Sequence, residues 1–114
     1  LDVTAPTIGT PSVSPESQTI GSGTSITVTI TDNTRVADAF VNVTYPNGAI
    51  GNYSIYQNKS GDSYSFSAQF SPIGSYSFHI AAEDPRNWAK SSTYQFSITE
   101  GTPPSLTGII YDLY

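Results

Sequence analysis

The strongest constraint on the fold is a strict alternation of apolar and polar residues between positions 74 and 84. Every second residue from Tyr76 to Ala82 is apolar, and the residues between them are mostly polar. A period of two residues is typical of a β-strand with one buried face. Gly74 opens the stretch and Asp84-Pro85 closes it, because proline has no amide hydrogen for a strand ladder and restricts the residue before it. We therefore predict a central strand here.

Similar alternation recurs in residues 25–31, 64–70 and 94–98, and further strands are expected at 36–45 and 50–56. A proline-rich edge strand is expected at residues 7–13. Nowhere do apolar residues recur at helical spacing over a useful length. The pattern predicts an all-β antiparallel sandwich of roughly seven or eight strands with no significant helix. Its predicted structural residues are Ile26, Val28, Ile30, Phe66, Tyr76, Phe78, Ile80, Trp88 and Phe96.

Composition and charge exclude several classes of function. Only 11% of the 114 residues are charged, the net charge is −5, and the four basic residues are scattered. A nucleic-acid-binding surface needs clustered Lys and Arg, so we expect no nucleic-acid partner. Cysteine is absent, which rules out disulfides and thiolate metal sites. No apolar run approaches the length of a membrane-spanning helix, so we expect no direct membrane insertion.

The two ends of the chain resemble each other. Residues 4–9 read Thr-Ala-Pro-Thr-Ile-Gly, and residues 102–108 read Thr-Pro-Pro-Ser-Leu-Thr-Gly. The offset is about 100 residues, the size of one immunoglobulin-type module. We expect a linker at 1–6, a sandwich module at 7–100, and a linker with the start of a following module at 101–114. The alternative is that two Pro/Thr-rich linkers look alike by chance.

The predicted central strand and its turn resemble a known group of modules. Residues 76–87 read Tyr-Ser-Phe-His-Ile-Ala-Ala-Glu-Asp-Pro-Arg-Asn, and they resemble the Tyr-x-Phe-x-Ile-x-Ala-x-Asp-x-x-Gly-Asn ending of immunoglobulin-like and fibronectin III-like modules in archaeal and bacterial surface proteins. Residues 28–33, Val-Thr-Ile-Thr-Asp-Asn, fit the same group. The sequence departs from it at Arg86, where the family usually has glycine. The resemblance implies an immunoglobulin-like (fibronectin III-like) sandwich, with Tyr76 as its tyrosine corner.

Catalysis is not expected. The chain has one histidine, His79, which the alternation places on the face opposite Phe78 and Ile80. It has neither a Gly-x-Ser-x-Gly motif nor a histidine pair of metal-binding spacing. Glu83 and Asp84 are adjacent on a strand end, so their side chains point to opposite faces and cannot act as a facing pair. We predict a non-enzyme without a cofactor.

Calcium is the one metal that the sequence makes a candidate. Asp32, Asn33 and Asp84 lie just beyond the ends of two strands expected to run in the same direction, and Asp112 lies near the predicted linker. Loop oxygens of this kind are the ligands that calcium prefers, and a shared ion would stiffen a joint between modules. The alternative is that these side chains satisfy the backbone of their own turns.

Three Asn-x-Ser/Thr tripeptides could carry N-glycans on an exported protein, at Asn42, Asn52 and Asn58. Such tripeptides also arise by chance in a chain rich in Asn, Ser and Thr. Asn58, in an expected turn, is the best candidate of the three.

Aromatic residues give a second argument for binding. Tyr53, Tyr56 and Trp88 do not all fit into one core, and exposed rings can stack on sugars or dock a partner. The alternative for Trp88 is that it folds back over the end of the sandwich, and we predict this because tryptophan is usually well buried.

These patterns together predict a non-catalytic structural or spacer repeat of a prokaryotic cell-surface or secreted protein. Its expected partners are neighbouring repeats of the same chain, and the isolated domain is expected to be a monomer. Because the chain begins with Leu1, we expect it to be a segment of something longer. Two alternatives stay open: an adhesive or carbohydrate-binding module that contacts cell-wall polysaccharide or a surface protein, and an accessory domain of a secreted hydrolase.

Overall fold

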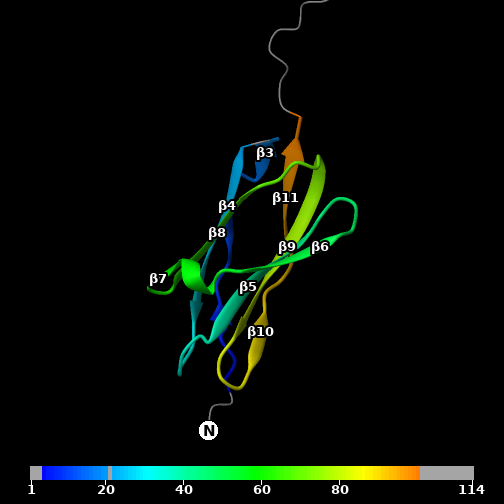
Figure 1. Cartoon of the computed structure of the whole chain (residues 1–114). Helices are drawn as coiled ribbons and strands as arrows, with labels where there is room; N and C mark the ends of the chain where they lie inside the picture. The colour runs from blue at the N-terminus through cyan, green and yellow to red at the C-terminus, as the bar shows by residue number, and fades with distance from the viewer. Residues whose placement is uncertain (1–3, 21, 101–114) are drawn as a thin grey trace, which may run out of the picture.

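The computed structural model describes residues 4–20 and 22–100, which form two β-sheets packed face to face (Figure 1). One sheet contains β1 (Thr7–Ile8), β2 (Ser12–Ser14), β4 (Gly23–Thr31), β7 (Lys59–Ser60) and β8 (Ser63–Gln69). The other contains β3 (Ser17–Thr19), β5 (Asp38–Thr44), β6 (Ile50–Ser54), β9 (Gly74–Glu83), β10 (Trp88–Lys90) and β11 (Tyr94–Thr99). Between β6 and β7 the chain makes one short 3-10 turn, η1 (Tyr56–Asn58). The predicted all-β immunoglobulin-like sandwich is confirmed.

Strand β4 organises the first sheet and β9 the second. β4 pairs with β1, β2 and β8, whereas β9 pairs with β5, β10 and β11, and all these pairs are antiparallel. The proline-rich edge strand expected at residues 7–13 is broken into β1 and β2. Both pieces pair with β4, and after the cis Ser14-Pro15 bond a further strand, β3, pairs in parallel with β11 in the opposite sheet. The expected edge strand therefore belongs to the first sheet, and β3, which was not expected, extends the second.

The core consists of the inward-facing residues that the alternation predicted. Along β4, and along β9 from Ser75 onward, buried and more exposed residues alternate. Aromatic rings fill the middle of the sandwich, where the Tyr76 ring lies 4.9 Å from the Phe96 ring and 5.0 Å from the Phe70 ring. The Tyr76 hydroxyl donates a hydrogen bond to the Pro72 carbonyl at 2.5 Å. A buried tyrosine that returns its hydroxyl to upstream backbone has the geometry of a tyrosine corner.

The prediction for Trp88 is wrong. Its side chain is 58% exposed and belongs to strand β10, not to a loop folded over the end of the sandwich. The physical reason is register: Trp88 pairs with Glu83, which faces away from the core, so Trp88 must face away as well. In contrast, Tyr53 and Tyr56 pack partly buried against the core, and the Tyr53 ring lies 5.1 Å from the Phe66 ring.

The turn between β5 and β6 forms the hairpin that Asn47-Gly48 predicted. Gly48 has a φ of 90°, a backbone conformation that favours glycine. The Asn47 side chain accepts the Ala49 amide hydrogen at 3.0 Å, and the Tyr45 amide donates to the Ala49 carbonyl at 2.8 Å. These local bonds fix the register in which β6 lies beside β5.

The described chain enters the sandwich at one end and leaves it at the other (Figure 1). Thr7 pairs with Thr31, the last residue of β4. At the opposite end, the side-chain amide of Gln18 donates to the carbonyl of Gly23, the first residue of β4, and the backbone amide of Ile20 donates to the Thr99 carbonyl at 2.9 Å. The whole length of β4 therefore separates the two ends. No helix within residues 4–20 and 22–100 is long and apolar enough to cross a bilayer.

Candidate functional site

The turn after β4 uses its aspartate to organise backbone. One carboxyl oxygen of Asp32 accepts the amide hydrogens of Thr34 at 2.8 Å and Arg35 at 3.1 Å. Asn33, beside it, is exposed. These bonds are those of an Asx turn, in which an aspartate side chain replaces a missing backbone partner. Asp32, one of the four predicted calcium ligands, is therefore engaged in local turn structure.

The turn after β9 uses Asp84 in the same way, but in the interior. Asp84 is only 1% exposed. One of its oxygens accepts the amide hydrogens of Arg86 at 2.7 Å and Asn87 at 2.5 Å, and the Asn87 side-chain amide donates to both oxygens, at 3.2 and 3.1 Å. The Asp84 amide in turn donates to the Asn87 carbonyl at 2.9 Å. This closed network holds the start of β10 beside β9.

The described candidate calcium ligands lie in two separate turns, Asp32 and Asn33 after β4 and Asp84 after β9. Asp32 and Asp84 both follow strands that end at the pole where the chain enters, but each is bonded within its own turn. The part of the chain that the structure describes contains no group of three or more His, Cys, Asp or Glu residues placed to hold a metal ion. Asp112 lies outside the described residues. The calcium site stays a prediction.

The three glycosylation candidates differ in setting. Asn42 is half-buried on the outer face of β5, and Asn52 lies directly opposite it on β6. Asn58, the last residue of η1, is exposed, and its amide donates to the Ile55 carbonyl at 3.0 Å. All three therefore reach the outside of the sandwich, and glycosylation at each stays a prediction.

His79 lies on the outer face of the six-stranded sheet, where Asn42 is its register partner. Partial burial lowers the pKa of His79 below its ordinary value, and the nearby positive charge of Lys90 lowers it further. A lowered pKa keeps the imidazole neutral at pH 7, so one ring nitrogen can donate and the other can accept a hydrogen bond.

An aromatic pair stands on the same outer face. The Trp88 ring stacks beside the Phe40 ring, with centroids 6.2 Å apart and planes 28° from parallel. Phe40 pairs with Ala81 on β9, and the short Ala81 side chain leaves room for the two rings to meet across that strand. We call this pair the Trp88–Phe40 platform. Figure 1 shows β10, β9 and β5, which carry it, side by side in the lower half of the molecule.

Sequence reasoning assigned Phe40 to a strand but gave it no role on the surface. A signal was present, because Phe40 and Val41 are consecutive and a strand sends consecutive side chains to opposite faces. The side chains of Val41 and Val43 point into the core, so the side chain of Phe40 has to point outward. Its meeting with Trp88 depends on the position of β10, for which the sequence carried no comparable signal.

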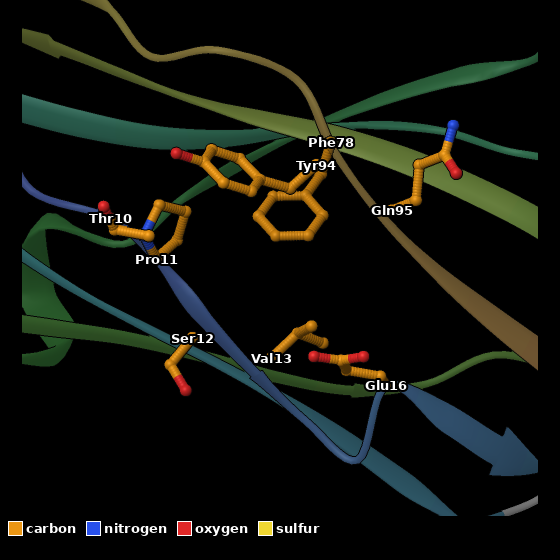
Figure 2. Close-up of a pocket in the computed structure, with 8 residues that line it drawn as sticks. All are labelled: Thr10, Pro11, Ser12, Val13, Glu16, Phe78, Tyr94 and Gln95. Carbon is orange, nitrogen blue, oxygen red and sulfur yellow. The ribbon is translucent and has the colours of Figure 1, made fainter.

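A hollow of about 430 Å³ lies between the open edges of the two sheets (Figure 2). Pro11, just before β2, and Val13, in β2, line it on one side. Phe78 and Tyr94 line it from the second sheet. Glu16 stands at one end. The hollow exists where the chain leaves the first sheet after β2 and joins the second at β3, so that no strand covers the gap.

No family model matches this chain, and no curated protein matches its sequence. Among solved structures, it is similar to the PKD domain of an M14-like peptidase from a Thermoplasmatales archaeon, at 23% identity over 84% of this chain and 97% of that chain, with a TM-score of 0.53. A bromine derivative of BhCBM56 matches at 14% identity over 68% of this chain and 80% of the other, with a TM-score of 0.54.

A third match is the Pseudomonas fluorescens alkylpurine DNA glycosylase AlkC bound to DNA containing an abasic site analog. It has 12% identity and a TM-score of 0.56, and the match covers 82% of this chain but only 30% of the glycosylase. At these identities the three likenesses show the fold alone, which is a two-sheet β-sandwich.

Proposed function

We propose that this chain is a non-catalytic structural module that spaces or displays the neighbouring parts of a longer cell-surface or secreted protein. The observation that carries the proposal is the placement of the chain entry and exit at opposite poles of the sandwich. Modules with this geometry extend a chain when they are joined end to end, whereas modules with adjacent ends fold it back on itself.

The gain in length follows from strand geometry. β4 contains nine residues and runs from one pole to the other. At about 3.3 Å per residue it spans roughly 30 Å. Each module would therefore add about 30 Å, plus its linker, to the reach of the protein.

The outer surface of the first sheet supports a spacing role. Its side chains are mostly short hydroxyls, since Ser25, Thr27 and Thr29 of β4 all face outward and are exposed. The Ser25 hydroxyl lies 3.1 Å from the Ser67 hydroxyl on β8. A hydroxyl-covered face gives solubility without charge, and it offers no apolar patch that a protein partner would bury.

A chain of three copies of residues 1–114, joined directly, tests the proposal by small-angle X-ray scattering. We expect the maximum dimension to rise by about 30 to 40 Å with each copy. A matched chain with flexible Gly/Ser segments between copies should be more compact on average. If the direct tandem is as compact as the flexible one, or if its copies stack side by side, the spacer proposal is wrong.

A second candidate function is that of an accessory domain of a secreted hydrolase. It is favoured by one observation, the likeness in fold to a domain of a peptidase. The full open reading frame separates the two candidates. Repeated copies of this module would support the spacer, and one copy beside a catalytic domain would support the accessory role.

A further inference from the structure

The Trp88–Phe40 platform is an unexpected use of large aromatic side chains. Among the described residues, the large hydrophobic side chains classed as exposed are Ile20, Ile50, Ile73 and Trp88. Trp88 lies on a strand with a fixed register, and the turn before it is stabilised by hydrogen bonds to the buried Asp84 side chain. A ring that could have been buried is instead presented to solvent on a rigid element, as a binding surface requires.

The residues around the platform form ordered rows across the sheet. One row runs from Lys90 through Ala81 and Phe40 to Ser54, on β10, β9, β5 and β6. Two residues further along the strands, or about 7 Å away, a second row contains His79, Asn42 and Asn52. In the first row the Phe40 ring lies beside Ala81, and Trp88 lies in the adjacent row with Glu83 and Asp38. The His79 row, on the other side of Phe40, offers neutral donors and acceptors. A surface of this kind can stack against one ring of a ligand and form hydrogen bonds with the next ring.

We propose that this face binds a linear, uncharged, β-linked glycan of gluco-configured pyranoses. One sugar stacks on the Trp88–Phe40 platform, and the hydroxyls of its neighbour hydrogen-bond with His79, Asn42 and Asn52. This inference goes beyond the spacer role and does not depend on it.

Electrostatic complementarity selects this class of ligand. The face of an aromatic ring is electron-rich, and it attracts the slightly positive C–H groups of a sugar. In a β-linked gluco pyranose every substituent is equatorial, so both faces of the ring present only C–H groups. An axial hydroxyl, as in manno or galacto sugars, interrupts one of these faces. The charged side chains on the strands beneath the rings are Lys90, Glu83 and Asp38, which give no excess of positive charge to recruit an acidic polysaccharide.

The size of the platform favours a glycan over a protein partner. Two aromatic side chains offer at most a few hundred Å², and Phe40 is already partly covered. A stable protein interface buries about 800 Å² on each partner around an apolar centre. The neighbouring positions here hold Ala81, His79 and Asn42, which do not enlarge the apolar area. The contact area of the platform matches that of one or two sugar rings.

The test is a ¹⁵N NMR titration of the 114-residue chain with cellohexaose, laminarihexaose and mannohexaose. We expect saturable shifts with the first or second sugar, confined to residues 38–42, 52, 79–83 and 88–90, with a dissociation constant at or below about 1 mM. Trp88 is the one tryptophan in the chain, so its fluorescence should change over the same concentrations. Mannohexaose should bind at least about tenfold more weakly, a difference of about 1.4 kcal/mol.

Two variants and a control locate the site. Trp88→Ala and Phe40→Ala should each weaken binding by about tenfold or more, and their amide spectra report whether the fold is kept. Ile73→Ala removes a side chain that is 53% exposed on the loop before β9, so it should leave binding unchanged. The proposal is overturned if neither gluco sugar produces shifts at about 10 mM, or if binding survives both aromatic variants. It is also overturned if mere concentration of the protein shifts the same amides, because a second copy then covers the platform.

Discussion

Two buried polar side chains show how differently single residues can be accommodated in one fold. Asp84 and Thr24 are both almost fully buried, at 1% and 0% exposed. Asp84 accepts hydrogen bonds from two backbone amides and from the Asn87 side chain. The Thr24 hydroxyl, in contrast, has no hydrogen-bond partner. Because an unmet buried donor costs free energy, the first residue should stabilise the fold and the second should weaken it.

Thr24→Val should therefore stabilise the protein. Valine has nearly the shape of threonine, and it removes the unpaired hydroxyl from the interior. We expect the free energy of unfolding to rise by about 1 kcal/mol in urea denaturation. Thr27→Val, on the exposed face of the same strand, should change it by less than about 0.5 kcal/mol. A loss of stability in Thr24→Val would mean that the hydroxyl is satisfied.

Asp84→Ala should have the opposite effect. It leaves the amides of Arg86 and Asn87 without their acceptor and detaches the turn that leads into β10. We expect a loss of about 2–4 kcal/mol, against about 1 kcal/mol for Asp32→Ala in its more exposed turn. Thermal unfolding of the wild type with calcium and with chelator completes the test. A calcium site at Asp84 would raise the melting temperature in calcium, whereas we expect no difference.

At the scale of strands and turns, the sequence predicted the elements whose side chains alternate. β4, β8, β9 and β11 could be predicted because their pattern is a direct result of one buried face. The short strands β3 and β10 could not, because three residues carry too little pattern. Their positions come from tertiary contacts: β3 follows the change of sheet, and β10 is fixed by the Asp84 turn.

The same limit applies to the candidate site. Asp32 and Asp84 were correctly placed beyond strand ends, and the alternative that they serve their own turns agrees with the observed bonds. The platform could not be predicted, because it requires the cross-strand register that brings Trp88 to Phe40. The usual burial of tryptophan side chains instead favoured a buried position for Trp88.

A glycine at the start of β9 gives a prediction at this scale. Gly74 has a φ of 140°, and a Cβ atom there would lie 2.9 Å from the Cβ atom of Pro46. Gly74→Ala should therefore cost about 1–3 kcal/mol of stability, measured by chemical denaturation. Gly23→Ala is the matched control, since nothing lies within 4 Å of the added atom and the change should stay within about 0.5 kcal/mol. Equal effects of the two substitutions would contradict the prediction.

At the scale of the whole molecule, buried tyrosines couple stability to alkaline pH. Burial, followed by the hydrogen bond with Tyr53, raises the pKa of Tyr45 from 10.0 to about 12. Burial also raises the pKa of Tyr64 and Tyr76. In each case the unfolded chain loses its proton at a lower pH than the folded chain does. The resulting stability is fully present below pH 10 and is lost as the pH rises toward 12.

We therefore expect the free energy of unfolding to fall steeply above about pH 10, as measured by urea denaturation at a series of pH values. Tyr45→Phe should have a shallower fall, because one of the titrating groups is gone. Thr27→Val serves as the control and should keep the wild-type slope. A flat profile up to pH 12 would show that these hydroxyls titrate alike in the folded and unfolded chains.

The parallel pairing of β3 with β11 has a mechanical consequence. β3 belongs to the N-terminal part of the described chain and β11 to its C-terminal part, and they pair along Ser17–Thr19 and Ser97–Thr99. When tension acts on the two poles, it pulls these strands past each other along their axes. The hydrogen bonds between them then bear the load together and must break almost at once, whereas the bonds of a hairpin pulled open would break one by one. A protein held under tension at its two ends would be kept closed by the pairing of β3 with β11.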